Sequence, residues 1–309
     1  MNGTQGTRHV IGLDAGGTKT VGLLADEAGA VLRDARAGGG NLTSEGELGV
    51  EKVLFQVIDA LDPPAPVAAL CLGIAGADRP AHREVVHGVL ARLGFRRRVR
   101  VVHDAVVALA AGAPDEIGIV IVAGTGSVAY GRDPDGRTAR SGGWGWLLGD
   151  EASAFWLGHA AVRQGIRAAD GRGPDTTLLD RIRRRVGVET PQDLADWFYR
   201  QDTPRTRVAE LAGVVEEAAG EGDAAAAALL DQAADHLARA ARAVAERLTF
   251  PQSFPLILAG GTFRACPGLV PRIEERLSLH PGLSGARVEL LAVEPARGAV
   301  TLALRELAS

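Results

Sequence analysis

An acidic residue heads a glycine-rich turn near the start of the chain, in the stretch Asp14-Ala15-Gly16-Gly17-Thr18-Lys19. Glycine turns let backbone N–H groups approach phosphate oxygens closely. The spacing matches neither the P-loop nor the Gly-x-Gly-x-x-Gly dinucleotide fingerprint. Phosphate would repel a carboxylate unless a cation lay between them, and Mg²⁺ keeps several waters and takes few protein carboxylates. These residues predict a metal-bound nucleotide, with Asp14 on the Mg²⁺ side and Gly16 to Lys19 on the phosphate side.

A second turn of the same kind ends an apolar stretch at Gly124-Thr125-Gly126. Landmarks in the two stretches align, because Ala15 and Ala123 are 108 residues apart while Gly29 and Gly136 are 107 apart. Strand, glycine turn, strand, acidic turn and strand therefore occur twice, which indicates an internal duplication. A single turn of this kind is also compatible with an ordinary strand end, at which Asp14 would form local hydrogen bonds. The presence of a second copy favours phosphate binding.

Strands alternate with helices around these turns. Apolar stretches predict buried strands near 9–15, 67–77, 98–103, 116–123 and 254–259, and helical spacing predicts helices over 45–61, 79–94, 104–112 and 296–307. Residues 147–249 read as mainly helical. This alternation predicts a sheet with parallel strands that is covered by helices on both faces.

Composition narrows the functional classes. The chain has 309 residues, 46% of them hydrophobic, and a formal net charge of -4, so it is large enough for two domains and unsuited to nucleic acid. Two distant cysteines argue against a disulfide framework or a zinc site. No apolar run is long enough to span a bilayer. The polar start predicts no signal peptide, so we expect a cytoplasmic protein.

Three stretches resemble the phosphate-one, phosphate-two and adenosine motifs of the sugar kinase, heat-shock-protein and actin superfamily: LDAGGTKT at 13–20, VAGTGSVAYG at 122–131 and LAGGTFR at 258–264. Two more stretches are similar to the N-acetylglucosamine kinase branch of the BadF/BadG/BcrA/BcrD ATPase family: HDAVVALAAG at 103–112 and GGWGWLLGDEASAFWLG at 142–158. The resemblance covers nearly the whole chain, although residues 165–250 match only as generic helices.

The resemblance implies a duplicated actin-like (ribonuclease H-like) α/β ATPase fold with two domains around a nucleotide cleft. The N-terminal domain would span 1–114, with the terminal helix 296–309 packed on it. The C-terminal domain would span 115–295 and contain a helical insertion at about 165–250.

The resemblance also implies roles for individual residues. Asp14 would orient hydrated Mg²⁺, and Asp104 would be the catalytic base. The residues implied to contact the nucleotide are Gly16, Gly17, Thr18, Lys19, Thr125, Gly126, Ser127, Gly260, Gly261 and Thr262. Those implied to bind the sugar are Asn41, Asp104, Gly143, Trp144 and Asp150.

The residues themselves leave some of these roles open. Asp104 opens a helix, where an acid is also a common N-cap, and the two roles can coexist. Asp150 also reads as the start of a helix, so the same alternative applies. Trp144 lies between glycines, which makes it poor core material and a good platform for a sugar ring.

The resemblance implies an ATP-dependent kinase that transfers the γ-phosphate of Mg²⁺-ATP to the 6-hydroxyl of N-acetylglucosamine, with glucosamine as the alternative substrate and a homodimer as the expected assembly. Two other classes stay open. An activator ATPase coupled to electron transfer would need thiolates for an iron–sulfur cluster, and neither Cys71 nor Cys266 resembles such a ligand. A nucleotide or sugar sensor would bind the same ligands without transferring phosphate.

Overall fold

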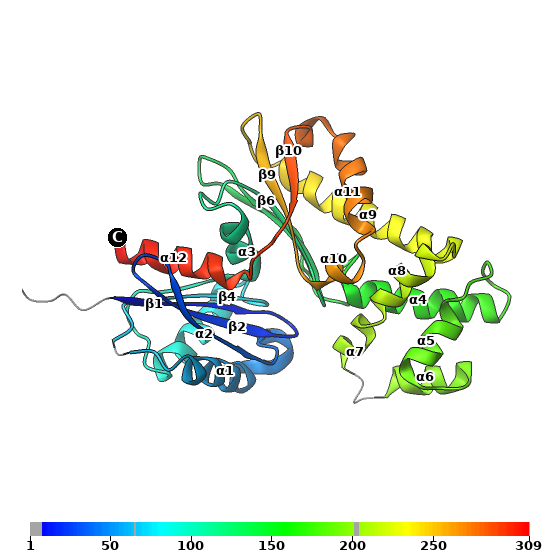
Figure 1. Ribbon diagram of the computed structural model, residues 1–309, viewed down its shortest axis with the longest axis horizontal. Coiled ribbons are helices and arrows are strands. Elements are labelled where there is room, and N and C mark those ends of the chain that lie inside the picture. The colour runs from blue at the N-terminus through cyan, green and yellow to red at the C-terminus, as the bar shows by residue number, and fades with distance from the viewer. Residues whose placement is uncertain (1–7, 65, 201–203, 309) are drawn as a thin grey trace, which may run out of the picture. The chain divides into compact units, whose positions relative to one another are not determined.

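The structure is a computed structural model that describes residues 8–64, 66–200 and 204–308 (Figure 1). The polar start of the chain, where the sequence predicts no signal peptide, lies largely outside the described residues. The chain divides into two compact units. The first comprises residues 1–118 and 290–309, and the second comprises residues 119–289.

The first unit is built on a mixed five-stranded sheet with the strand order β3-β2-β1-β4-β5. Strand β1 pairs with β2 antiparallel and with β4 parallel, β2 pairs with β3 antiparallel, and β4 pairs with β5 parallel. The strands are β1 (His9–Ala15), β2 (Thr20–Asp26), β3 (Val31–Ala37), β4 (Ala69–Ile74) and β5 (Val99–His103). The carboxyl ends of β1, β4 and β5 therefore meet at one edge of the sheet.

Helices cover both faces of this sheet (Figure 1). Side chains of β1 alternate between the faces, because successive residues of a strand point to opposite sides. Ile11 and Leu13 pack with helices α1 (Leu42–Leu61) and α2 (Pro80–Arg92). Val10 packs on the other face with α3 (Asp104–Gly112) and the terminal helix α12 (Ala296–Ala308).

The second unit repeats the strand order of the first. Its sheet runs β10-β9-β6-β7-β8, so both sheets place their third, second, first, fourth and fifth strands side by side in that order. The strands are β6 (Gly118–Ala123), β7 (Ser127–Arg132), β8 (Thr138–Gly142), β9 (Phe254–Ala259) and β10 (Ala286–Leu290). The predicted duplicated α/β fold is confirmed.

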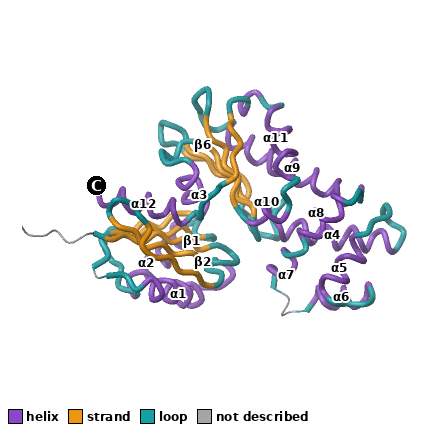
Figure 2. Tube along the Cα trace, viewed as in Figure 1, coloured by secondary structure: helices purple, strands orange, loops and turns teal. Residues whose placement is uncertain are grey.

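Most of the chain between β8 and β9 is helical (Figure 2). These helices form one hydrophobic core with the second sheet. They are α4 (Ala154–Ala169), α5 (Leu178–Val186), α6 (Pro191–Tyr199), α7 (Arg205–Ala209), α8 (Ala212–Gly220) and α9 (Ala224–Ala245). After β9 come α10 (Gly261–Ala265), α11 (Leu269–Ser278) and the short 3₁₀ helix η1 (Pro281–Leu283). Within the described residues, no helix combines the length and the hydropathy that crossing a bilayer requires.

Candidate active site

The first unit gathers the predicted site residues of its half of the chain at the carboxyl edge of the sheet, where open α/β sheets commonly bind ligands. Backbone hydrogen bonds join the loops at this edge. The Gly40 N–H donates to Gly16 O at 2.9 Å, and the Ala75 N–H donates to Ala15 O at 3.0 Å. The turn at Gly16 therefore lies against the segment before Asn41 and the loop after β4.

Asp14 lies near the end of β1 with 9% of its surface exposed. It shares its sheet face with Gly12, which lies under α12, because strand side chains alternate. No described residue forms a hydrogen bond or ion pair with its carboxylate. Burial, together with the negative charge of Asp104, raises the pKa of Asp14 to about 8. A nearby cation would relieve both effects, so the residue fits the predicted hydrated Mg²⁺. The described residues form no group of three or more metal-ligating side chains, so most ligands of such an ion would be water or substrate.

Lys19 is held by a residue that sequence reasoning missed. Its Nζ lies 2.8 Å from Glu294 Oε2, in the segment just before α12. Arg36 Nη1 lies 3.0 Å from the other oxygen of the same carboxylate. Partial burial alone would raise the pKa of the Glu294 carboxyl, but its ion pairs with Lys19 and Arg36 lower it. The ammonium is thus positioned at the turn, and its contact with phosphate stays a prediction.

Asn41 occupies the N-cap position of α1, where its Oδ1 accepts a hydrogen bond from the Thr43 N–H at 2.8 Å. The cap fixes the side chain beside Gly76, at which an added Cβ would lie 3.0 Å from Asn41 Oδ1. Its amide NH₂ group donates no hydrogen bond to a described residue. Capping and the predicted sugar contact therefore use different atoms of one side chain.

Asp104 follows β5 directly and forms an array with His103 and Asp78. Nδ1 of His103 lies 2.7 Å from Asp104 Oδ1, and Nε2 of His103 lies 3.0 Å from Asp78 Oδ1. An imidazole that faces a carboxylate from each nitrogen must carry both protons to satisfy both contacts. The ring is therefore an imidazolium between two carboxylates. Sequence reasoning missed His103 and Asp78.

The expected N-cap role of Asp104 is wrong, because His103 occupies the N-cap position and Asp104 is the first residue of α3. The Ala105 N–H lies 2.8 Å from Asp104 Oδ1 and 3.2 Å from His103 Nδ1. A protonated Nδ1 cannot accept this hydrogen bond, so we assign it to Asp104. Both contacts that the described residues make with the Asp104 carboxylate end on Oδ1.

The array keeps Asp104 ionised. Burial alone would raise the pKa of Asp104, but the charge and hydrogen bond of His103, together with the Ala105 N–H, lower it below its usual value. Burial would likewise lower the pKa of His103, whereas Asp104 and then Asp78 raise it to about 10. Asp14 is thus buried and Asp104 partly buried in the same unit, and the pKa values of their carboxyl groups move in opposite directions.

The second unit brings its two predicted nucleotide motifs together. The hydroxyl of Thr262 donates to Gly124 O at 3.2 Å. Gly260 has a φ of +111°, and a Cβ at this position would lie 2.1 Å from Ala123 O. Only glycine fits this approach without strain. The turn after β9 therefore packs directly against the turn after β6.

Asp150 lies against the same turn. Its Oδ1 accepts a hydrogen bond from the Ser127 N–H at 3.3 Å, and a Cβ on Gly126 would lie 2.9 Å from its Oδ2. Burial raises the pKa of Asp150. The expectation that it begins a helix is wrong, since it has a φ of +58° and α4 begins four residues later behind the N-cap Ser153.

Trp144 lies on an apolar loop between β8 and α4, with 65% of its surface exposed. Gly143 before it has a φ of +71°. The guanidinium of Arg140 lies 5.0 Å from the centre of the Trp144 ring, close enough for a cation–π contact. The same loop exposes Trp146, Leu147 and Leu148. The expectation that Trp144 is not core material is confirmed.

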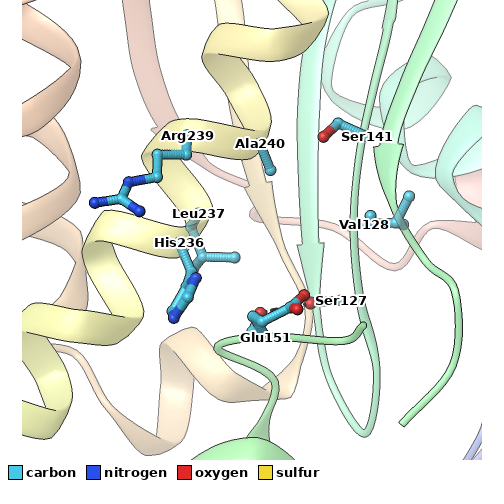
Figure 3. Close-up of a pocket in the computed structure, with 9 residues that line it drawn as sticks. Ser127, Val128, Ser141, Glu151, His236, Leu237, Arg239 and Ala240 are labelled. Carbon is cyan, nitrogen blue, oxygen red and sulfur yellow. Dashed lines mark hydrogen bonds between the residues drawn. The ribbon is translucent and has the colours of Figure 1, made fainter. Parts of the chain in front are cut away.

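A pocket of about 190 Å³ lies in the second unit beside Ser127 (Figure 3). His236 and Arg239 line it from α9, while Val128 and Ser141 line it from β7 and β8. Of the predicted site residues, only Ser127 belongs to its lining. The pocket is therefore a neighbour of the predicted ligand residues and not their common site.

The two cysteines lie in apolar surroundings. Cys71 and Cys266 are free and buried, one in each unit. Burial raises the pKa of each thiol to about 12. Thiols in this state are poor metal ligands, since a cluster needs thiolates.

Comparisons with known proteins agree with the fold. The profile of the BadF/BadG/BcrA/BcrD ATPase family matches residues 11–303. The chain is 33% identical to an N-acetylmuramic acid/N-acetylglucosamine kinase of Clostridium acetobutylicum, over 88% of this chain and 91% of the relative. It is 30% identical to an N-acetyl-D-glucosamine kinase of Dictyostelium discoideum, over 95% and 97%. A solved structure of a proposed N-acetylglucosamine kinase from Chromobacterium violaceum superposes with a TM-score of 0.76 at 28% identity, covering 96% of this chain and 98% of the other.

Proposed function

Because the chain belongs to the BadF/BadG/BcrA/BcrD ATPase family, we propose that it is an ATP-dependent kinase that phosphorylates the 6-hydroxyl of N-acetylglucosamine. Two relatives that align over most of the chain are named as kinases of this sugar. The observation that supports the chemistry best is the pair Asp14 and Asp104. Buried carboxyl groups whose pKa values are moved apart mark distinct roles within one site.

In the proposed reaction Asp104 is the base. It orients the sugar 6-hydroxyl and takes up its proton as the oxygen attacks the γ-phosphorus of ATP. A bond forms between O6 and the γ-phosphorus, and the bond from that phosphorus to the β–γ bridging oxygen breaks. ADP leaves with the electron pair. Little basicity is needed, because phosphoryl transfer passes through a loose transition state in which the hydroxyl loses its proton late.

Nucleotide binding is assigned to the glycine turns of the two units. Gly16 to Lys19 and Thr125 to Ser127 contact phosphates in this proposal, and Gly260 to Thr262 pack against the adenosine. Asp14 would hold Mg²⁺ through water, and the ion would supply positive charge to the phosphate oxygens. The packing of Thr262 on Gly124 supports a shared role for the second and third turns.

Sugar binding is assigned to Asn41, Gly143, Trp144, Asp150 and Asp104. The free amide group of Asn41 offers two donors for a sugar hydroxyl or carbonyl. The exposed ring of Trp144 offers an apolar face to the sugar ring. The cytoplasmic location stays a prediction from the sequence, and the homodimer stays a prediction from the family.

A panel of sugars tests the proposed function. With Mg²⁺-ATP, we expect ADP release to depend on an added sugar and to be fastest with N-acetylglucosamine. The panel includes glucosamine, N-acetylmuramic acid, glucose and N-acetylmannosamine, and a coupled assay measures ADP. Equal ADP release with and without every sugar would refute the kinase function and favour an ATPase or a sensor. A fastest rate with glucosamine would select the alternative substrate.

Nucleotide binding has its own test in the Asp14→Ala and Thr125→Val variants. Asp14→Ala removes the charge expected to hold the metal, so Mg²⁺-ATP affinity should fall by at least about tenfold, the loss of about 1.4 kcal/mol. Thr125→Val removes a hydroxyl at similar volume and should weaken binding less. Titration calorimetry measures both, with Thr138→Val, at the exposed first position of β8, as the control for the second variant. Parent-like affinities in both variants would contradict the assignment of the two turns.

A further inference from the structure

The array of Asp78, His103 and Asp104 contains two residues with no assigned part in the reaction. Asp78 comes from the loop after β4, and His103 is the last residue of β5. The side chains of His103 and Asp104 are largely buried, at 17% and 19% exposure, and that of Asp78 is 31% exposed. These side chains follow or end β4 and β5, two neighbouring parallel strands.

We propose that His103 is a positioning residue for Asp104: anchored at Nε2 by Asp78, it donates from Nδ1 to Asp104 Oδ1 and so directs Oδ2 to the hydroxyl of the acceptor. This inference rests on the proposed kinase function, because it assigns His103 a role only if Asp104 receives a proton from the substrate.

Three contacts make the orientation specific. The carboxylate of Asp104 is fixed on one oxygen by the imidazolium at 2.7 Å and by the Ala105 N–H at 2.8 Å. Two donors on one oxygen leave little freedom for rotation about the bond to the carboxyl group. Asp78 prevents the ring from turning away, because rotation of the ring would break the 3.0 Å contact at Nε2.

The same contacts set the charge of the array. Among the described residues, the ionisable groups that face the His103 ring are the carboxylates of Asp78 and Asp104. With the pKa of His103 raised to about 10, the ring stays protonated throughout the range in which a kinase works. Asp104 then remains a carboxylate even though it is partly buried and feels the charge of Asp14.

The kinetic test uses His103→Ala, His103→Asn and Asp78→Asn. His103→Ala should lower kcat by about 10- to 100-fold, the rate equivalent of one charge-assisted hydrogen bond, while KM for sugar and nucleotide changes less than about threefold. His103→Asn should recover part of the loss, since its amide can still donate to Asp104. Asp78→Asn should lower kcat less than His103→Ala. The exposed His87→Asn in α2 serves as the control.

A spectroscopic test is independent of turnover. In ¹⁵N-labelled parent protein, the His103 ring should carry both protons at pH 8, and Asp78→Asn should lower its pKa. The missing signal in His103→Ala identifies the resonance.

Three outcomes would overturn the proposal. A neutral His103 ring in the parent at pH 8 would remove the array. A parent-like kcat in His103→Ala, measured below its unfolding temperature, would leave His103 a structural role only. A parent that forms the array but phosphorylates no sugar would refute the proposed function and with it this role of His103, while the array itself would stand.

Discussion

Replacing Asp104 with Asn is expected to lower sugar phosphorylation by about 10²–10⁴-fold, the usual cost of losing general-base help. The amide oxygen of Asn can still accept hydrogen bonds from His103 and Ala105, so the orientation of the side chain is retained. It cannot take up the proton of the 6-hydroxyl near neutral pH. The rate of ADP formation with saturating N-acetylglucosamine and Mg²⁺-ATP measures the loss.

The structure changes what Asp104→Asn should do to stability. If Asp104 were an N-cap, Asn would replace it at little cost. Because it is instead paired with the His103 imidazolium, the neutral amide removes one partner of an ion pair, and the melting temperature should fall. Rates must therefore be compared well below that temperature. The exposed Asp115→Asn of the same unit should change neither rate nor stability. If Asp104→Asn phosphorylates sugar at close to the parent rate, the base must be sought elsewhere, first at Asp150.

Much of the fold could be predicted because the signals are local and repeated. Apolar strands ending in glycine turns occur in both halves, and the shift of about 108 residues predicted an internal duplication, with which the matching strand orders of the two sheets agree. Strand β10 (Ala286–Leu290) was missed. Its five residues, Ala286 to Leu290, alternate between apolar and polar types as a strand does, but the run is short and none of them is buried. Its pairing with the second sheet decides its structure, and pairing is not a local property.

The candidate site was predictable only in part, for a similar reason. Asp14 is the second-last residue of β1 and Asp104 follows β5 directly, so a sequence that predicts the strands also predicts where these two residues lie. Asp78 lies 25 residues before His103, and only the parallel pairing of β4 with β5 brings the two together. Glu294 reaches Lys19 from the opposite end of the chain. The helix start expected at Asp150 failed because a left-handed turn there leads to a cap at Ser153.

The packing of α12 on α3 makes Gly298 the most sensitive glycine of the first unit. A Cβ at this position would lie 2.0 Å from Val107 O and 2.6 Å from Ala111 N. Both atoms belong to the backbone of α3, so no side-chain rotation can relieve the clash, and the two helices would have to separate. Separation would also expose Val300, which packs in the core between α12 and the sheet.

Gly298→Ala should therefore destabilise the first unit by about 3 kcal/mol, the upper end of the usual cost of overpacking, even though alanine favours the helix. Gly88→Ala in α2 is the matched control. A Cβ there meets only the end of the Arg92 side chain at 3.8 Å, so this change should stabilise the same unit by about 0.4–1 kcal/mol.

Cys71, buried in β4, reports opening of the first unit through its labelling rate with a thiol reagent. The four tryptophans, Trp144, Trp146, Trp156 and Trp197, all lie in the second unit and report its unfolding by fluorescence. Labelling of Cys71 should be faster in Gly298→Ala and slower in Gly88→Ala than in the parent. Equal labelling rates in the two variants would contradict the close approach of α12 to α3. If Gly298→Ala changed only the tryptophan fluorescence, the second unit and not the first would be destabilised, which would also contradict the prediction.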